Sequence, residues 1–156
     1  MNQQILPQAE LVTQRLAGKL PHIDINGTDF TIDLRLQELR ETEMPWNHIS
    51  IMDLEPSLDG DDQLFLYDTQ KHCAYELDDN ITELPEHVVL VALPDDFTLD
   101  PVAAARAVGY EETKFLDEYP IKQFLIAGIT PLKDTFLPKM IEENLSRQNN
   151  SRGYIR

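Results

Sequence analysis

The stretch His22-Ile-Asp-Ile-Asn-Gly-Thr-Asp-Phe-Thr-Ile-Asp33 decides the fold, because it has the pattern of a β-hairpin. Two alternating segments flank Asn26-Gly27, and both residues of this pair tolerate the positive φ that a type I′ turn requires. Alternation on the returning strand predicts one apolar face that packs on the core. The residues expected on that face are Phe30, Ile32, Leu34 and Leu36.

Further apolar segments extend the β-structure toward the middle of the chain. Residues 63–68 and 73–77 flank a four-residue loop at 69–72, which predicts a second hairpin. A short strand is also expected around residues 49–52. Residues 87–93 form the most apolar stretch, since every residue after His87 is apolar and several are β-branched, as is typical of a central strand buried on both faces.

Helices are predicted mainly in the carboxy-terminal third. Asp100 is a good N-cap residue, Pro101 suits the first helical turn and Gly109 suits the end, which together predict a helix over residues 102–108. The other expected elements are a helix within residues 7–20, a short helix over 111–118, a last strand over 124–129 and a helix that begins at Pro138.

Strands that precede helices are the order of an α+β domain. We therefore predict antiparallel β-hairpins in the N-terminal two-thirds that form one sheet, packed by short helices from the C-terminal third. The length of 156 residues favours a single domain, expected over residues 1–145. Residues 146–156 have no hydrophobic periodicity and are predicted to be a mobile polar tail.

The composition is that of an ordinary globular domain, with 42% hydrophobic and 26% charged residues, which excludes wholly disordered and collagen-like classes. Cys73 is the single cysteine and is typical of a reducing compartment. The first eleven residues lack the pattern of a secretory signal, and no apolar run approaches the roughly 20 residues of a membrane helix. We expect a cytoplasmic protein without a membrane anchor.

Negative charge is concentrated in the middle of the chain. The net charge is −15, and the window from Glu41 to Ala105 holds 16 acidic residues against one basic residue, Lys71. A field of this sign repels nucleic-acid backbones and anionic membranes, whereas it attracts basic proteins and cations. The same charge would also serve solubility alone.

Sequence motifs of catalysis or cofactor binding are not found. The six glycines form no P-loop, dinucleotide-binding loop or nucleophile elbow, and the four histidines form no His-x-x-x-His pair. Ala105-x-x-x-Gly109 resembles the centre of a helix-turn-helix, but the residues that follow are mostly acidic, which argues against direct DNA binding. These residues are Glu111, Glu112, Asp117 and Glu118, against Lys114. We predict no cofactor, no metal ligand and no catalytic residue.

Three local patterns have a second interpretation. The cluster Asp59-Gly60-Asp61-Asp62, with Asp53 and Glu55 upstream, could bind Ca²⁺ or Mg²⁺, although a solvated turn uses the same residue types and Leu66 stands where an EF-hand needs Glu. His22 and Asp24 would share one face of a strand and could act together. Cys73 could be a nucleophile assisted by a distant histidine, but its apolar neighbours favour a buried side chain.

The leading hypothesis is a small acidic non-enzymatic interaction or regulatory protein that binds a basic partner surface, as an inhibitor, immunity-type factor, nucleic-acid mimic or adaptor would. The expected partner-binding residues are Trp46, Glu55, Asp59, Asp61, Asp62, Asp78 and Asp79. The alternative is a divalent-cation-dependent or hydrolytic enzyme that uses carboxylates of the 41–105 window, with His22 or His48 as an acid or base. A third class is a subunit of a larger complex, since the oligomeric state is not predicted.

Overall fold

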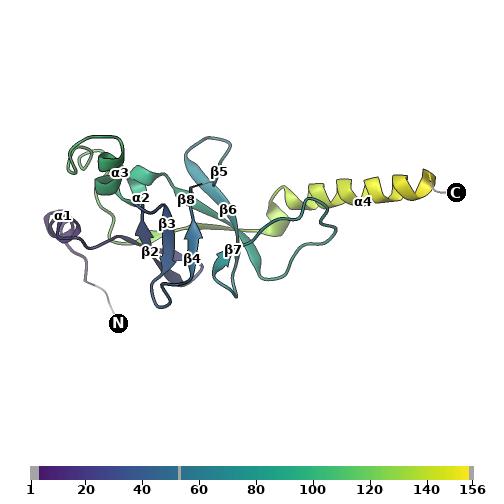
Figure 1. The fold of residues 1–156 in the computed structure, drawn as a ribbon, viewed down its shortest axis with the longest axis horizontal. Coiled ribbons are helices and arrows are strands. Elements are labelled where there is room, and N and C mark those ends of the chain that lie inside the picture. The colour runs from purple at the N-terminus through teal and green to yellow at the C-terminus, as the bar shows by residue number, and fades with distance from the viewer. Residues whose placement is uncertain (1–3, 53, 155–156) are drawn as a thin grey trace.

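The computed structural model describes residues 4–52 and 54–154, and most of its strands precede its helices (Figure 1). The helices are α1 (Gln8–Leu16), α2 (Asp96–Leu99), α3 (Pro101–Ala107), the 3₁₀ helix η1 (Leu132–Asp134) and α4 (Leu137–Tyr154). The strands are β1 (His22–Ile25), β2 (Thr28–Asp33), β3 (Glu38–Glu41), β4 (His48–Ser50), β5 (Glu55–Pro56), β6 (Asp62–Asp68), β7 (Cys73–Ala74), β8 (Val88–Pro94), β9 (Leu125–Ile126) and β10 (Gly128–Pro131). The predicted α+β class is confirmed.

Both predicted hairpins form. β1 pairs antiparallel with β2, and the turn residues Asn26 and Gly27 have φ values of 50° and 90°, which suit a type I′ turn. β6 pairs with β7 around the loop at residues 69–72. One detail of the first hairpin was wrong: β2 ends at Asp33, so Leu36 lies in the next turn and is exposed rather than packed on the core.

The strands form two sheets, so the prediction of one sheet was wrong. Sheet A has the order β4-β3-β2-β1-β9, and sheet B has the order β10-β8-β6-β5 with β7 also paired to β6. The segment expected as one strand over residues 124–129 divides at Ala127. Before this residue the chain runs parallel to β1, and after it the chain pairs antiparallel with β8. This division joins the two sheets along one continuous piece of chain.

One apolar core lies between the two sheets. It combines sheet A residues such as Ile23, Phe30 and Leu39 with sheet B residues such as Tyr67 and Val91. The rings of Phe30 and Tyr67 meet edge to face across the sheets, with centroids 6.2 Å apart. β8 lies between β10 and β6, and none of its residues is exposed, as the sequence predicts for a central strand.

A buried ion pair connects the first helix to the helices that follow β8. The Asp100 carboxylate caps α3 by accepting a hydrogen bond from the Ala103 N–H at 3.2 Å, as predicted. The same carboxylate accepts hydrogen bonds from Arg15 Nε at 3.1 Å and from Arg15 Nη2 at 2.9 Å. Because both side chains are buried, this bidentate pair ties α1 to α3.

One prediction for the carboxy-terminal region was wrong, because residues 111–118 form turns instead of a helix. The helix expected to begin at Pro138 forms as α4 and continues to Tyr154, so residues 146–154 extend it away from the sheets (Figure 1). The buried first turns of α4, at Leu137 and Ile141, provide the nucleus from which such a helix propagates without an apolar face. Residues 155–156 lie outside the described residues, and the division at 145 stays a prediction.

Candidate functional site

An acidic groove lies where the β5–β6 hairpin meets the junction between β8 and α2. The register of sheet B pairs Asp62 with Pro94, which brings the acidic pair at 61–62 beside the acidic pair at 95–96. The groove has a volume of about 340 Å³ and is lined by four carboxylates and no basic side chain. Its lining residues are Leu54, Pro56, Gly60, Asp61, Asp62, Gln63, Asp95, Asp96 and Phe97.

The turn that presents two of these carboxylates is held by its own hydrogen bonds. The Ser57 hydroxyl and the Asp61 backbone N–H both donate to the Asp59 carboxylate, which lowers the pKa of Asp59 below its ordinary value. The Ser57 hydroxyl oxygen in turn accepts a hydrogen bond from the Asp62 N–H at 3.1 Å. Asp59 is therefore a charged part of the turn, while the carboxylates of Asp61 and Asp62 bond to no described residue.

Apolar residues also line the groove, and one of them is aromatic. Phe97 lines it together with the two acidic pairs, and its ring packs edge to face on Phe115, with centroids 5.1 Å apart. Tyr119 packs on the same ring with centroids 5.5 Å apart. A fixed aromatic face among carboxylates attracts a cationic side chain through both the ring and the charges.

Four of the seven predicted partner-binding residues come together on this hairpin. Glu55, Asp59 and Asp61 are exposed and Asp62 is half-buried, and the last two line the groove. Sequence reasoning missed the other half of the site, which is Asp95, Asp96 and Phe97. Antiparallel pairing of the two apolar segments that form β6 and β8 is the signal that could have found them. Such pairing brings the residues that precede β6 beside the residues that follow β8.

Trp46, one of the expected partner-binding residues, lies far from the groove and is 76% exposed. The neighbouring Asn47 side chain bonds to the carbonyls of Lys71 and His72, in the loop that follows β6. The groove lies at the other end of β6, and a strand of this length spans about 20 Å. Trp46 and the acidic hairpin therefore do not form one compact site.

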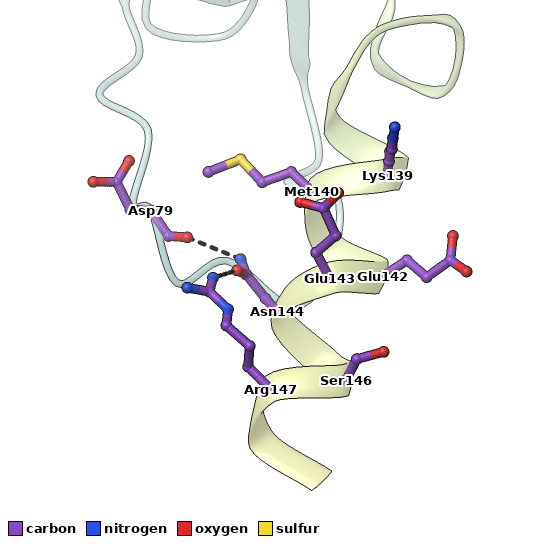
Figure 2. A pocket seen from close by; sticks show the side chains of 8 residues that line it. All are labelled: Asp79, Lys139, Met140, Glu142, Glu143, Asn144, Ser146 and Arg147. Carbon is purple, nitrogen blue, oxygen red and sulfur yellow. Dashed lines mark hydrogen bonds between the residues drawn. The ribbon is translucent and has the colours of Figure 1, made fainter. Parts of the chain in front are cut away.

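Asp78 and Asp79 lie in a loop that packs on α4. The buried Asn144 side chain donates a hydrogen bond of 2.8 Å to the backbone oxygen of Asp79 (Figure 2). It donates another of 2.8 Å to the backbone oxygen of Ile81. A second groove of about 710 Å³ runs beside this contact, but Lys139 and Arg147 line it together with acids. Its mixed charge suits a cationic ligand less than the acidic groove does.

A buried polar cluster that the sequence did not indicate closes the sheets at the Trp46 end. Glu41, 4% exposed, accepts hydrogen bonds from the Asn47 amide at 3.0 Å and from His72 Nδ1 at 3.1 Å. His72 Nε2 lies 3.5 Å from the Thr28 hydroxyl. The signal available was the alternation of β3, which places Glu41 on the same inward face as Leu39.

Tyr67 belongs to the same cluster. Burial raises the pKa of Tyr67 to about 12, the Thr28 hydroxyl opposes this shift, and the negative charge of Glu41 adds to it. The Tyr67 hydroxyl is buried, and no described residue, Thr28 included, meets the geometry of a hydrogen bond to it. The ring is thus positioned by packing rather than by its hydroxyl.

The remaining candidate residues from the sequence are the His22–Asp24 pair, the possible cation ligands and Cys73. His22 Nδ1 pairs with Asp29 at 2.6 Å, whereas Asp24 accepts the Gly27 N–H at 3.1 Å, so the proposed His22–Asp24 pair does not form. Within the described chain, no group of three or more His, Cys, Asp or Glu residues is placed to hold a metal ion. Asp53, part of the cation hypothesis, lies outside the described residues. Cys73 is a free, half-buried thiol in β7.

Comparison of the chain with protein-family models, with curated proteins and with solved structures found no match. Across residues 4–52 and 54–154, no helix is both long and apolar enough to cross a membrane. The functional assignment therefore depends on the geometry and charge of the sites described above.

Proposed function

We propose that this protein is a small, acidic, non-enzymatic interaction or regulatory protein whose acidic groove binds a basic surface of a protein partner. The roles that fit are those of an inhibitor, an immunity-type factor, a nucleic-acid mimic or an adaptor. We also propose a cytoplasmic location, because a single half-buried free cysteine is typical of proteins from reducing compartments.

The observation that carries this proposal is the groove lined by four carboxylates and by a phenylalanine ring that packs on Phe115, with no basic side chain in the lining to neutralise the carboxylates. On entering the groove, a lysine or arginine of a partner would form hydrogen bonds with the carboxylates and a cation–π contact with the aromatic ring. The surrounding acidic window would steer such a partner toward the site and speed its association at low ionic strength.

The test compares two double variants that remove equal charge. Asp61→Asn with Asp62→Asn neutralises the groove, and Asp78→Asn with Asp79→Asn neutralises the loop beside α4. Binding of a thirteen-residue lysine peptide is measured by calorimetry at two salt concentrations. We expect the groove variant to lose about tenfold in affinity, close to 1.4 kcal/mol, and the control to lose less than about twofold. Equal losses would show that only net charge matters and would contradict a groove-specific site.

A second candidate function, a hydrolytic enzyme, is favoured by one observation. Glu41, His72 and Thr28 form a carboxylate, imidazole and hydroxyl chain with separations of 3.1 and 3.5 Å, the order of groups that activates a hydroxyl nucleophile. Hydrolysis of p-nitrophenyl acetate by the wild-type protein and by Thr28→Ala tests this function. A rate above background that Thr28→Ala removes would support it, and a rate that Thr28→Ala leaves unchanged would count against it.

A further inference from the structure

Four large apolar side chains are exposed along the chain that leads from the β3–β4 loop to the β5–β6 turn, and three of them are much more exposed than the fourth, Met44, at 39%. Trp46 is 76% exposed, Met52 is 68% exposed and Leu58 is fully exposed at the tip of the turn. This stretch follows β4, the edge of sheet A, and then β5, the edge of sheet B (Figure 1). We call these three residues the apolar edge, and its far end adjoins the acidic groove.

The loop that carries Trp46 is held in place although the indole is exposed. The Asn47 amide donates hydrogen bonds to the Glu41 carboxylate and to the backbone oxygens of Lys71 and His72, at 3.0, 3.3 and 2.8 Å. The Thr42 N–H donates to the Asp29 carbonyl at 3.0 Å. Because this loop is already held in place, little backbone freedom is lost when a partner binds to Trp46, and tryptophan is enriched among the residues that dominate binding energy.

Acidic side chains accompany the apolar edge along its length. Glu43, Glu55 and Asp59 are exposed next to or between the three apolar residues. The nearest base on sheet A, Arg40, is engaged by Asp33 at 2.8 Å and by Glu38 at 3.1 Å, so its charge is compensated within the protein. Lys71, in the loop that Asn47 contacts, is the exposed base beside Trp46, so the three acids leave the edge with net negative charge. A partner that combines apolar side chains with positive charge therefore complements this edge.

We propose that the apolar edge and the acidic groove together bind one basic amphipathic segment of a protein partner. Apolar side chains of that segment cover Trp46 and Met52, and a lysine or arginine enters the groove. Trp46 and Met52 are six residues apart in the chain, so their backbones lie at most about 20 Å apart, a distance that six residues of an extended segment span. The inference rests on the proposed function, because it uses the groove as one end of the binding surface.

The experiment uses two thirteen-residue peptides and the full-length protein. One peptide is all lysine, and the other has leucine at positions 1 and 7. The proteins are wild type, Trp46→Ala and the control Ile126→Ala, whose side chain is 74% exposed in β9, away from the edge. Affinities are measured by calorimetry, and thermal melts verify that all three proteins fold.

Wild type and Ile126→Ala should bind the leucine-containing peptide about tenfold more tightly than the lysine peptide, and Trp46→Ala should lose this difference while its affinity for the lysine peptide stays unchanged. Equal behaviour of Trp46→Ala and Ile126→Ala would overturn the inference. If wild type binds both peptides with equal affinity, the proposed role of the apolar edge is wrong while the proposed function stands. If neither peptide binds wild type, the proposed function fails as well.

Discussion

Carboxylate groups at the two ends of β6 have opposite surroundings. At the Asp62 end, the carboxylates of Asp61 and Asp62 face the groove without bonding to any described residue. Near the Asp68 end, the Glu41 carboxylate is buried and accepts hydrogen bonds from Asn47 and His72. Both ends belong to the acidic window of the sequence.

The difference follows from the cost of burying charge. A carboxylate removed from water needs partners within the protein, and removing one partner leaves the other unpaired. A carboxylate that stays in water needs none and remains available to a ligand. Glu41 is therefore expected to stabilise the fold, and the groove carboxylates to contribute to binding.

Asp100 extends this comparison to the most buried carboxylate and should give the largest effect. Asp100→Ala removes the three hydrogen bonds from Arg15 and the cap of α3, leaving a buried guanidinium without its partner. We expect the free energy of unfolding to fall by about 3–5 kcal/mol in urea denaturation. Arg106→Ala is the control, because it breaks an exposed pair with Glu112 and should cost less than about 1 kcal/mol. Similar losses of unfolding free energy in both variants would contradict the expectation that the buried ion pair stabilises the fold more than the exposed one.

Glu41→Ala should give the next largest effect. It leaves the Asn47 amide and His72 without their shared acceptor at the end of the core, and we expect the free energy of unfolding to fall by about 2–4 kcal/mol. Asp61→Ala removes an exposed carboxylate and is the matched control, with an expected change below about 0.5 kcal/mol. If Glu41→Ala were as stable as Asp61→Ala, the buried carboxylate would contribute no more to stability than the exposed one.

Alkaline pH should reveal the buried hydroxyl of Tyr67. Its pKa in the folded protein is about 12, above the ordinary value of 10, so the unfolded chain loses this proton first. The contribution to stability is complete below pH 10 and is lost as the pH rises toward 12, by up to about 2 kcal/mol. Tyr67→Phe should remove this part of the loss, measured as the free energy of unfolding at pH 9 and 11. Parallel pH dependence of wild type and variant would contradict the assignment.

Local patterns were enough to predict most of the β-structure. The Asn26-Gly27 pair, the loop at 69–72 and the apolar run within 87–93 each contain their own signal, and all three elements formed. The returning strand predicted over 73–77 is shorter than expected, because β7 ends at Ala74. The division of residues 124–129 at Ala127 depends on two distant strands, β1 and β8, and has no local signature. Pairing partners of short strands are set by tertiary packing, so the number of sheets could not be read from the pattern.

The candidate site was half predictable for the same reason. The acidic hairpin at 55–62 is visible in the sequence as a turn rich in aspartate. Phe97 and its acidic neighbours are brought beside this hairpin only by the register between β6 and β8. Both strands were predicted, so pairing them antiparallel could have indicated this contact. Glu41 was counted with the surface acids because a charged residue at the end of a strand gives no sign that a histidine from another loop will cover it.

Neutralising the groove should have the smallest effect on stability and a sign opposite to that of the buried carboxylates. Asp61→Asn with Asp62→Asn reduces repulsion among four carboxylates that line one groove, so the free energy of unfolding should rise by about 0.5 kcal/mol or less. The gain should be larger at 10 mM salt than at 1 M salt, because salt screens repulsion between exposed charges. Urea denaturation at the two salt concentrations measures both effects. A loss of more than about 1 kcal/mol would assign these carboxylates a structural role, and the contrast between the two ends of β6 would then disappear.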